Sequence, residues 1–297
     1  MKVERTRFDN HDGVEVRTAE FSLIAVADCG PRIAFLGRTG GANLLLWEPG
    51  KYTRGDWDLR GGHRVWSTTP LADECENTYR PDNQPCELRI EKGKCTLLGA
   101  EDPISRTRRG FSVEPMNDNL FKIDNFIVNT SDMLCAGGVW ALTCTLPTAG
   151  CRYAVPVGDG SSWDTFTMVF FRQWAGHGAH SFEDGQIRVG KDQVTIEPAG
   201  LENKRMLQAH KGIIAMSDAQ NDLTFGKKTV YDRNARYPLG ANLAFYVGTD
   251  NFMVEMETMG PERTLKPGEE LHHVEWWSLT DGAKPLQSAR ESEALFV

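Results

Sequence analysis

Hydrophobic positions along this chain occur mostly in short runs with a period of two, which is the spacing of a β-strand. Segments rich in Val, Ile, Phe and Thr are separated by Gly, Asn, Asp and Pro, and residues 120–129 (LFKIDNFIVN) alternate well. No segment keeps a helical period over three turns, although residues 286–295 are compatible with a short helix. The pattern predicts an all-β sandwich or barrel. Strands are expected at residues 21–27, 32–36, 87–90, 95–98, 120–129, 138–146, 165–174, 186–190, 193–197, 212–217, 242–247, 252–258 and 273–279.

So many strands at short spacing indicate a large antiparallel sandwich, in which each sheet buries one face against the other. The chain has 297 residues, and no Pro- or Ser-rich tract, charge block or repeat divides it. We therefore expect a single domain over residues 1–297. A ligand site is then expected on a concave outer face of a sheet or among the loops at one edge.

The charge of the chain narrows the class of partner. The 33 basic and 41 acidic residues are interspersed and give a formal net charge of −8. This balance argues against nucleic acid or an anionic membrane as a partner, because both require a basic face. The first residues are charged, and no apolar run approaches the about 18 residues of a membrane span. We expect a cytoplasmic protein, and a homodimer is one option for its oligomeric state.

The cysteines do not indicate a metal site. There are seven, an odd number without CxxC spacing, so free thiols in a reducing cytoplasm are expected. Cys75 and Cys86 lack a second pair at ligand spacing. His177 and His180 have the spacing H-x-x-H but lack a third ligand. The sequence therefore predicts neither a metal nor another cofactor.

Residues 59–66 (LRGGHRVW) combine positive charge, one imidazole and a glycine pair, with Trp57 and Trp66 on either side. Arg60, His63 and Arg64 supply hydrogen-bond donors, and the glycines allow backbone conformations closed to other residues or the close approach of a ligand. This combination is typical of a pocket for a polar ligand with a flat apolar face. The alternative is a strand-to-loop turn whose arginines pair with surface acids.

Three blocks of the chain, residues 21–47, 59–66 and 252–279, resemble the galactose mutarotase-like proteins. Residues 21–47 (FSLIAVADCGPRIAFLGRTGGANLLLW) are similar to the opening of that family, and LRGGHRVW is similar to the Arg-Gly-Gly segment of its hexose-6-phosphate mutarotase branch. Residues 252–279 (FMVEMETMGPERTLKPGEELHHVEWWSL) are similar to its closing pattern. The resemblance implies a β-supersandwich, which agrees with the expected strands. Residues 78–85 and 227–240 look like a less characterised branch of this superfamily.

The resemblance also implies mutarotation, in which a base and an acid interconvert the two anomers of an aldose. Glu257 matches the catalytic glutamate of the family, which precedes the turn Pro267-Gly268-Glu269. On a strand, Glu255 and Glu257 project from one face and raise each other's pKa. The alternative is the solvated face of an edge strand.

The proton donor is less evident. The family's donor is a histidine in the middle of the chain, whereas residues 137–146 contain none and have Trp140 instead. His63 is the candidate acid, since imidazole titrates near neutral pH. His177 and His180 are a second option, and His272 and His273 alternate faces on the last expected strand, so at most one of them points at the site.

Further residues are candidate substrate contacts. Arginine and lysine favour an anionic sugar, a uronic acid or a sugar phosphate. Tryptophans, here Trp57, Trp66, Trp140 or Trp163, stack on a pyranose, or else they pack in the core. Arg60 and Arg64 are expected to orient the substrate and stabilise charge. The other candidate contacts are Glu255, Tyr79, Trp140, Lys204, Lys227 and Tyr237.

The sequence thus predicts a carbohydrate-active enzyme, an aldose 1-epimerase or a related isomerase of an acidic or modified sugar, with Glu257 as base and His63 as acid. One alternative is a non-catalytic sugar-binding or regulatory domain, which the absent mid-chain histidine favours. Another is a lyase or hydrolase on the same scaffold, because a fold does not determine a function.

Overall fold

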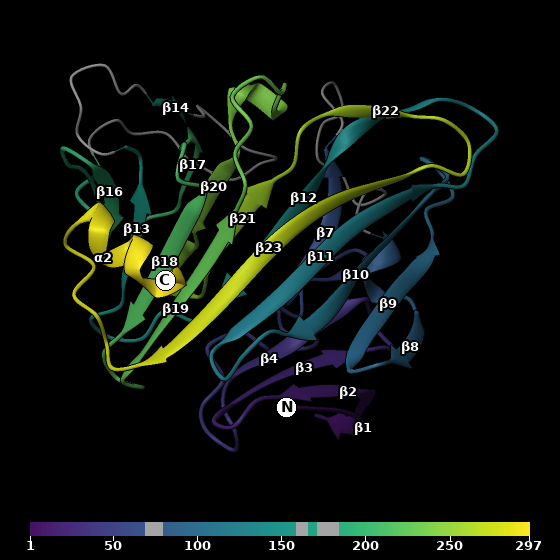
Figure 1. Ribbon diagram of the computed structural model, residues 1–297, viewed down its shortest axis with the longest axis horizontal. Coiled ribbons are helices and arrows are strands. Elements are labelled where there is room, and N and C mark those ends of the chain that lie inside the picture. The colour runs from purple at the N-terminus through teal and green to yellow at the C-terminus, as the bar shows by residue number, and fades with distance from the viewer. Residues whose placement is uncertain (69–79, 159–165, 171–183) are drawn as a thin grey trace.

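Two antiparallel sheets make up most of the described chain, which in this computed structural model comprises residues 1–68, 80–158, 166–170 and 184–297 (Figure 1). The first sheet follows the order β1 (Lys2–Phe8), β2 (His11–Arg17), β3 (Phe21–Val26), β4 (Arg32–Arg38), β7 (Gly62–Thr68), β12 (Cys135–Thr145), β21 (Val254–Met259), β20 (Leu243–Val247), β17 (Asn203–Gln208) and β14 (Thr167–Phe170). The short strand β22 (Arg263–Leu265) pairs with β12.

The second sheet lies over the inner face of the first. Its order is β15 (Ile187–Val189), β16 (Gln193–Ile196), β13 (Arg152–Pro156), β18 (Ile213–Asp218), β19 (Leu223–Thr229), β23 (Glu270–Asp281), β11 (Leu120–Asn129), β10 (Thr107–Pro115), β9 (Lys94–Glu101) and β8 (Glu87–Glu91). The long strand β23 pairs with β11 on one side and β19 on the other, so distant parts of the chain meet at its centre.

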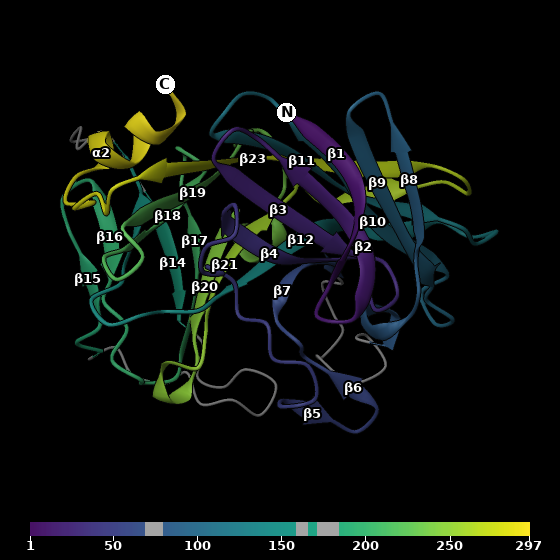
Figure 2. The same ribbon diagram turned by 90° about the horizontal axis from the view of Figure 1, so that it is seen from below.

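Short elements complete the described chain. A small hairpin of β5 (Thr53–Arg54) and β6 (Trp57–Asp58) lies beyond β7, on the side of the first sheet away from β23 (Figure 2). No helix within the described ranges is long and apolar enough to cross a membrane. The helical segments are η1 (Arg80–Asn83), η2 (Pro238–Gly240), η3 (Thr249–Asn251), α2 (Ala289–Glu293) and η4 (Ala294–Phe296).

Alternate side chains of the strands fill the space between the sheets. On β7 and β12, Val65 and Val139 belong to the main hydrophobic core, whereas Trp66 and Leu142 form a separate cluster on the outer face. The two-residue period of the sequence therefore has its physical basis in the pleat, which points successive side chains to opposite faces.

A buried polar network crosses this core. Lys227 Nζ lies 2.9 Å from Glu275 Oε1 and donates to Thr143 Oγ1 at 2.8 Å. His63 contacts Thr143 Oγ1 through Nδ1 and Asn125 Oδ1 through Nε2, each at 2.9 Å. These five side chains are fully buried, so the charges have one another rather than water as partners.

The predicted elements agree with this architecture in most places. The segment 120–129 is β11 in full, and the strands expected at residues 87–90 and 95–98 are β8 and β9, which pair as a hairpin. The expected strand 165–174 lies partly outside the described residues, and the C-terminal helix is reduced to α2 followed by η4. The turn interpretation of LRGGHRVW applies only to its first residues, because β7 begins at Gly62.

Candidate functional site

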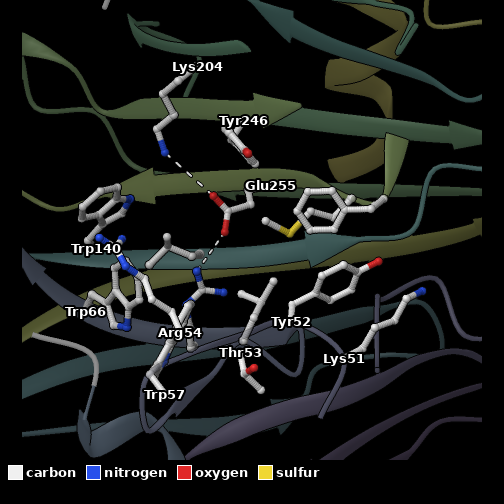
Figure 3. Close-up of a pocket in the computed structure, with 15 residues that line it drawn as sticks. Lys51, Tyr52, Thr53, Arg54, Trp57, Trp66, Trp140, Lys204, Tyr246 and Glu255 are labelled. Carbon is white, nitrogen blue, oxygen red and sulfur yellow. Dashed lines mark hydrogen bonds and ion pairs between the residues drawn. The ribbon is translucent and has the colours of Figure 1, made fainter. Parts of the chain in front are cut away.

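A cavity of about 490 Å³ opens on the outer face of the first sheet (Figure 3). Outward-facing side chains of β7, β12, β21, β20 and β17 line it, together with residues 51–54, 57, 59, 252 and 253. Small-molecule sites typically have volumes of roughly 300–1,000 Å³. The cavity therefore has the size of a site for one small ligand.

Glu255 lies on the floor of the cavity. It accepts a hydrogen bond from Arg64 Nη2 at 2.9 Å, and its other oxygen lies 3.9 Å from Lys204 Nζ. Burial raises the pKa of this carboxyl group, but Arg64 and then Lys204 outweigh burial and hold the pKa below its ordinary value. Glu255 is therefore ionised at neutral pH and lines the space that a ligand would occupy.

Glu257 lies deeper on the same face of β21 and is fully buried. Lys204 Nζ contacts one of its oxygens, and Trp140 Nε1 donates to the other at 2.7 Å. Burial raises the pKa of Glu257, Lys204 opposes that rise, and the charge of Glu255 adds to it, so the pKa lies above its ordinary value. The two carboxyl groups share one ammonium group, and their surroundings move their pKa values apart.

Aromatic rings form one wall. Trp66 and Trp140 meet edge to face with ring centroids 5.8 Å apart, and the Arg64 guanidinium lies 4.5 Å from the centroid of Trp66. Asp82 fixes two of the indoles, because its Oδ2 accepts from Trp66 Nε1 at 2.7 Å and from Trp57 Nε1 at 3.4 Å. The wall is thus held by hydrogen bonds as well as by packing.

The opposite wall and the rim add a second aromatic surface and two cations. Tyr52 and Phe252 pack with ring centroids 4.7 Å apart. Lys51 pairs with Glu48 at 2.7 Å. Arg54, which is exposed, has no ion-pair partner within the part of the chain that the structure describes, and Figure 3 shows it on the side of the cavity where Trp57 and Trp66 lie. The mouth of the cavity therefore carries positive charge.

The glycine pair determines how the chain enters β7. Gly61 and Gly62 have φ of 94° and 72°. A Cβ on Gly61 would lie 2.2 Å from the carbonyl oxygen of Leu46, and one on Gly62 would lie 2.3 Å from that of Ile33. The glycines are thus required by the close approach of two backbone segments rather than of a ligand.

Arg32 holds the same turn from inside the protein. Its Nη1 donates to the carbonyl oxygens of Leu59 at 3.0 Å and Gly61 at 2.7 Å, and its Nη2 donates to that of Asp82 at 3.3 Å. One buried guanidinium therefore ties the start of β7 to η1, the segment that supplies the acceptor of the tryptophan wall.

The residues expected to converge on one surface do not do so. His63 and Arg64 are neighbours on β7, so their side chains point to opposite faces, and only Arg64 lines the cavity. His63 lies between the sheets, where burial lowers its pKa to about 4. Arg60 Nε lies 3.3 Å from Asp58 Oδ2, and Arg60 does not line the cavity. This placement corrects the expectation that Arg60, His63 and Glu257 act together at one site.

The other expected residues divide into four groups. Arg64, Glu255, Trp140 and Lys204 all line the cavity. Lys227 belongs to the network between the sheets. Outside the described residues lie Tyr79, Cys75, Trp163, His177 and His180.

Tyr237 and the C-terminal histidines lie elsewhere. Tyr237 stacks on Tyr231 with centroids 5.2 Å apart, away from the cavity lining. His272 pairs with Asp124 on the outer face of the second sheet, whereas His273 is buried against Thr258. The two histidines alternate faces as expected, and neither lines the cavity.

Several lining residues were not anticipated from the sequence. Tyr246 donates to Glu202 Oε1 at 2.5 Å and faces the cavity from β20. Tyr52, Arg54 and Phe252 come from irregular or very short segments that carry no periodic pattern. Tyr246 pairs directly with Glu255 across neighbouring strands, a relationship that depends on the strand register and is therefore not visible in the sequence.

The sequence matches no protein-family model and no curated protein. Solved structures do resemble it in fold. A candidate aldose 1-epimerase from Escherichia coli K12 has a TM-score of 0.60 at 12% identity, over 90% of this chain and 98% of that one. A galactose mutarotase-like protein from Clostridium acetobutylicum has a TM-score of 0.58 at 12% identity, over 95% of this chain and 99% of that one. A candidate mutarotase from Salmonella typhimurium has a TM-score of 0.58 at 11% identity, over 94% of each chain.

These likenesses establish that the chain has the galactose mutarotase-like fold, a large antiparallel β-sandwich. The fold class predicted from the strand pattern and from the sequence resemblance is confirmed.

Proposed function

We propose that this protein is an aldose 1-epimerase that acts on a sugar carrying a negatively charged group. The observation that supports this most directly is the ionised carboxylate of Glu255, which lies 3.9 Å from the ammonium group of Lys204 on the floor of an aromatic-walled cavity. Candidate enzymes of this class are among the solved structures with the same fold.

The proposed reaction opens and recloses the sugar ring. Anomer exchange requires a base that takes the proton of the anomeric hydroxyl and an acid that protonates the ring oxygen. Both oxygens are bonded to the same carbon, so a base and an acid that lie side by side can reach both. Glu255 takes the hydroxyl proton while Lys204 protonates the ring oxygen, and the bond between that oxygen and the anomeric carbon breaks. The aldehyde turns, and the reverse transfers close the ring on its other face.

Glu257, the base expected from the sequence, takes a different role in this proposal. It is fully buried and does not line the cavity, whereas Glu255 does. Its contact with Lys204 fixes the position of the ammonium group. Glu257 therefore acts as a positioning residue for the acid, and Trp140 holds it in place through the indole N–H.

The substrate class follows from the aromatic and charged side chains that line the cavity. Trp66 and Trp140 offer flat apolar surfaces for a pyranose ring, and Arg64 is already engaged by Glu255. Arg54 at the rim is free to pair with a carboxylate or phosphate on the sugar, which a guanidinium recognises bidentately. We place a uronic acid or a sugar phosphate in this cavity, with its anionic group toward Arg54.

The test is the approach of single anomers to equilibrium, followed by NMR after the protein is added. The panel contains neutral hexoses, uronic acids and sugar phosphates. We expect faster anomer exchange, with the greatest acceleration for an anionic sugar. No acceleration with any sugar of the panel would overturn the proposal.

A sugar-binding protein without catalysis is the second candidate, and one observation favours it. Among the described residues no histidine lines the cavity, and Glu255 is already paired with cations. Binding in the same panel without faster exchange identifies this function, while new product signals identify a lyase or hydrolase.

The proposal includes the cytoplasmic location expected from the sequence. The six cysteines within the described ranges are free thiols, which supports a reducing compartment.

A further inference from the structure

A second cluster of reactive side chains lies where the β1–β2 turn meets the β3–β4 turn. His11 begins β2, and Asp28 and Cys29 follow the end of β3. His11 Nδ1 lies 3.0 Å from Asp28 Oδ1 and 3.5 Å from Cys29 Sγ. The three donor atoms all lie within 4.8 Å of one another, and none of the three residues lines the cavity of the first sheet.

The two distances from His11 Nδ1 are close to those between neighbouring ligands of a tetrahedral metal site. With zinc bonds of about 2.0–2.1 Å to nitrogen and oxygen and about 2.3 Å to sulfur, tetrahedral angles put neighbouring ligand atoms about 3.3–3.6 Å apart. The observed distances of 3.0 and 3.5 Å require a displacement of only a few tenths of an ångström. Imidazole, carboxylate and thiolate are also the ligand types that zinc prefers.

One ring nitrogen of His11 faces both the Asp28 carboxylate and the Cys29 sulfur. The three side chains therefore point to one common region, where a single metal ion could bind all three atoms at once.

The surroundings hold the three side chains in place. Cys29 is buried, and the His11 ring packs edge to face on Trp47 with centroids 5.7 Å apart. The backbone N–H of Ala27 donates to the carbonyl oxygen of Asp12 at 2.8 Å, so the two turns are joined beside the cluster. Asp28 is exposed, which leaves the fourth side of the cluster to solvent.

We propose that His11, Asp28 and Cys29 bind one zinc ion, with a water molecule as the fourth ligand. The ion clamps the β1–β2 hairpin onto the β3–β4 turn and is separate from the proposed sugar chemistry. Burial raises the pKa of the Cys29 thiol to about 11, so binding displaces the thiol proton to solvent and coordinates the sulfur as thiolate.

The test uses the full chain, freed of any histidine tag and treated with a chelator. Co²⁺ is titrated in as a spectroscopic probe, and Zn²⁺ is used to displace it. We expect one equivalent of Co²⁺ with the intense visible bands of a tetrahedral ion, a cysteinate-to-cobalt charge-transfer band, and loss of both bands on addition of Zn²⁺. Zn²⁺ is also expected to raise the Tm.

Variants distinguish this site from non-specific thiol binding. Cys29→Ser is expected to abolish the charge-transfer band and weaken Zn²⁺ binding by about tenfold or more. Asp28→Asn changes an exposed side chain, preserves the fold and is expected to weaken binding as well. Cys135→Ser, at a partly buried free cysteine outside the cluster, is the control and should bind as the parent does. An unchanged spectrum in Cys29→Ser, or no binding by the parent protein, would overturn the proposal.

Discussion

The carboxylate of Glu255 and the ammonium group of Lys204 face one another at 3.9 Å across the floor of one cavity. They come from β21 and β17, which are not neighbours, because β20 lies between them. Both groups are therefore positioned by the sheet itself rather than by a loop. A scaffold of this kind holds reacting groups in a fixed geometry, which acid–base catalysis requires.

The buried histidines predict that the protein loses stability in mild acid. Burial lowers the pKa values of His63 and His273 from 6.5 to about 4. The unfolded chain therefore binds more protons between these values, and stability falls as the pH falls through this window. Between about pH 7 and pH 5, each histidine should account for about 2 kcal/mol of lost unfolding free energy.

Urea unfolding at several pH values measures this effect. His63→Gln should make the unfolding free energy depend less on pH. His272→Gln, at an exposed position, should leave that dependence unchanged. Equal slopes in the parent and in His63→Gln would contradict the prediction.

The ion pair between the sheets predicts a large cost for the loss of one partner. Lys227→Met leaves Glu275 buried without its cation, although burial already opposes its charge and Lys227 is what lowers its pKa to about 2. We expect a loss of about 3–5 kcal/mol in unfolding free energy. The control is Lys228→Met at the adjacent, less buried lysine, which should cost less than about 1 kcal/mol. Similar losses in the two variants would show that the pair contributes little.

The entry into β7 predicts a steric requirement for glycine. Gly62→Ala places a Cβ 2.3 Å from the carbonyl oxygen of Ile33 in a backbone with φ of 72°. Gly93→Ala has a similar φ of 79° but meets no atom within 4 Å, so it isolates backbone strain from collision. Chemical denaturation should show a loss of about 1 kcal/mol for Gly93→Ala and roughly 3 kcal/mol or more for Gly62→Ala. Equal losses would mean that the collision is relieved without cost.

The charge at the cavity mouth predicts a change in sugar preference. Arg54→Gln should lower kcat/KM for an anionic sugar by about tenfold to a hundredfold, since a hydrogen bond to a charged group is lost. Anomer exchange of a neutral sugar should be unaffected, and Arg89→Gln on β8 is the matched control. An equal fall for both kinds of sugar would assign Arg54 a general role instead of anion recognition.

The strand pattern made most of the fold predictable, because a two-residue period has a direct physical cause in the pleat. The same argument placed Glu255 and Glu257 on one face, and the structure confirms it, since both contact Lys204. The edge-strand alternative for this segment is wrong, because β21 lies between β12 and β20.

The site was only partly predictable, for a reason visible in β7. A string such as LRGGHRVW shows which residue types are close in the chain but not which face each one occupies. Adjacent residues alternate, so His63 and Arg64 cannot both reach the cavity. Asp82 and Arg54 come from segments without a period, and only the folded chain brings them to the tryptophans and the cavity.

Anomer exchange by Glu255→Gln tests the proposed function most directly. Glutamine retains the shape and an acceptor for Arg64 but cannot take a proton, so sugar binding should persist while kcat falls by about a hundredfold or more. Glu257→Gln should also bind sugar, and its kcat should fall by a smaller factor of about ten, as expected of a positioning residue. Full activity in Glu255→Gln, with or without a loss in Glu257→Gln, would contradict the assignment of Glu255 as the base.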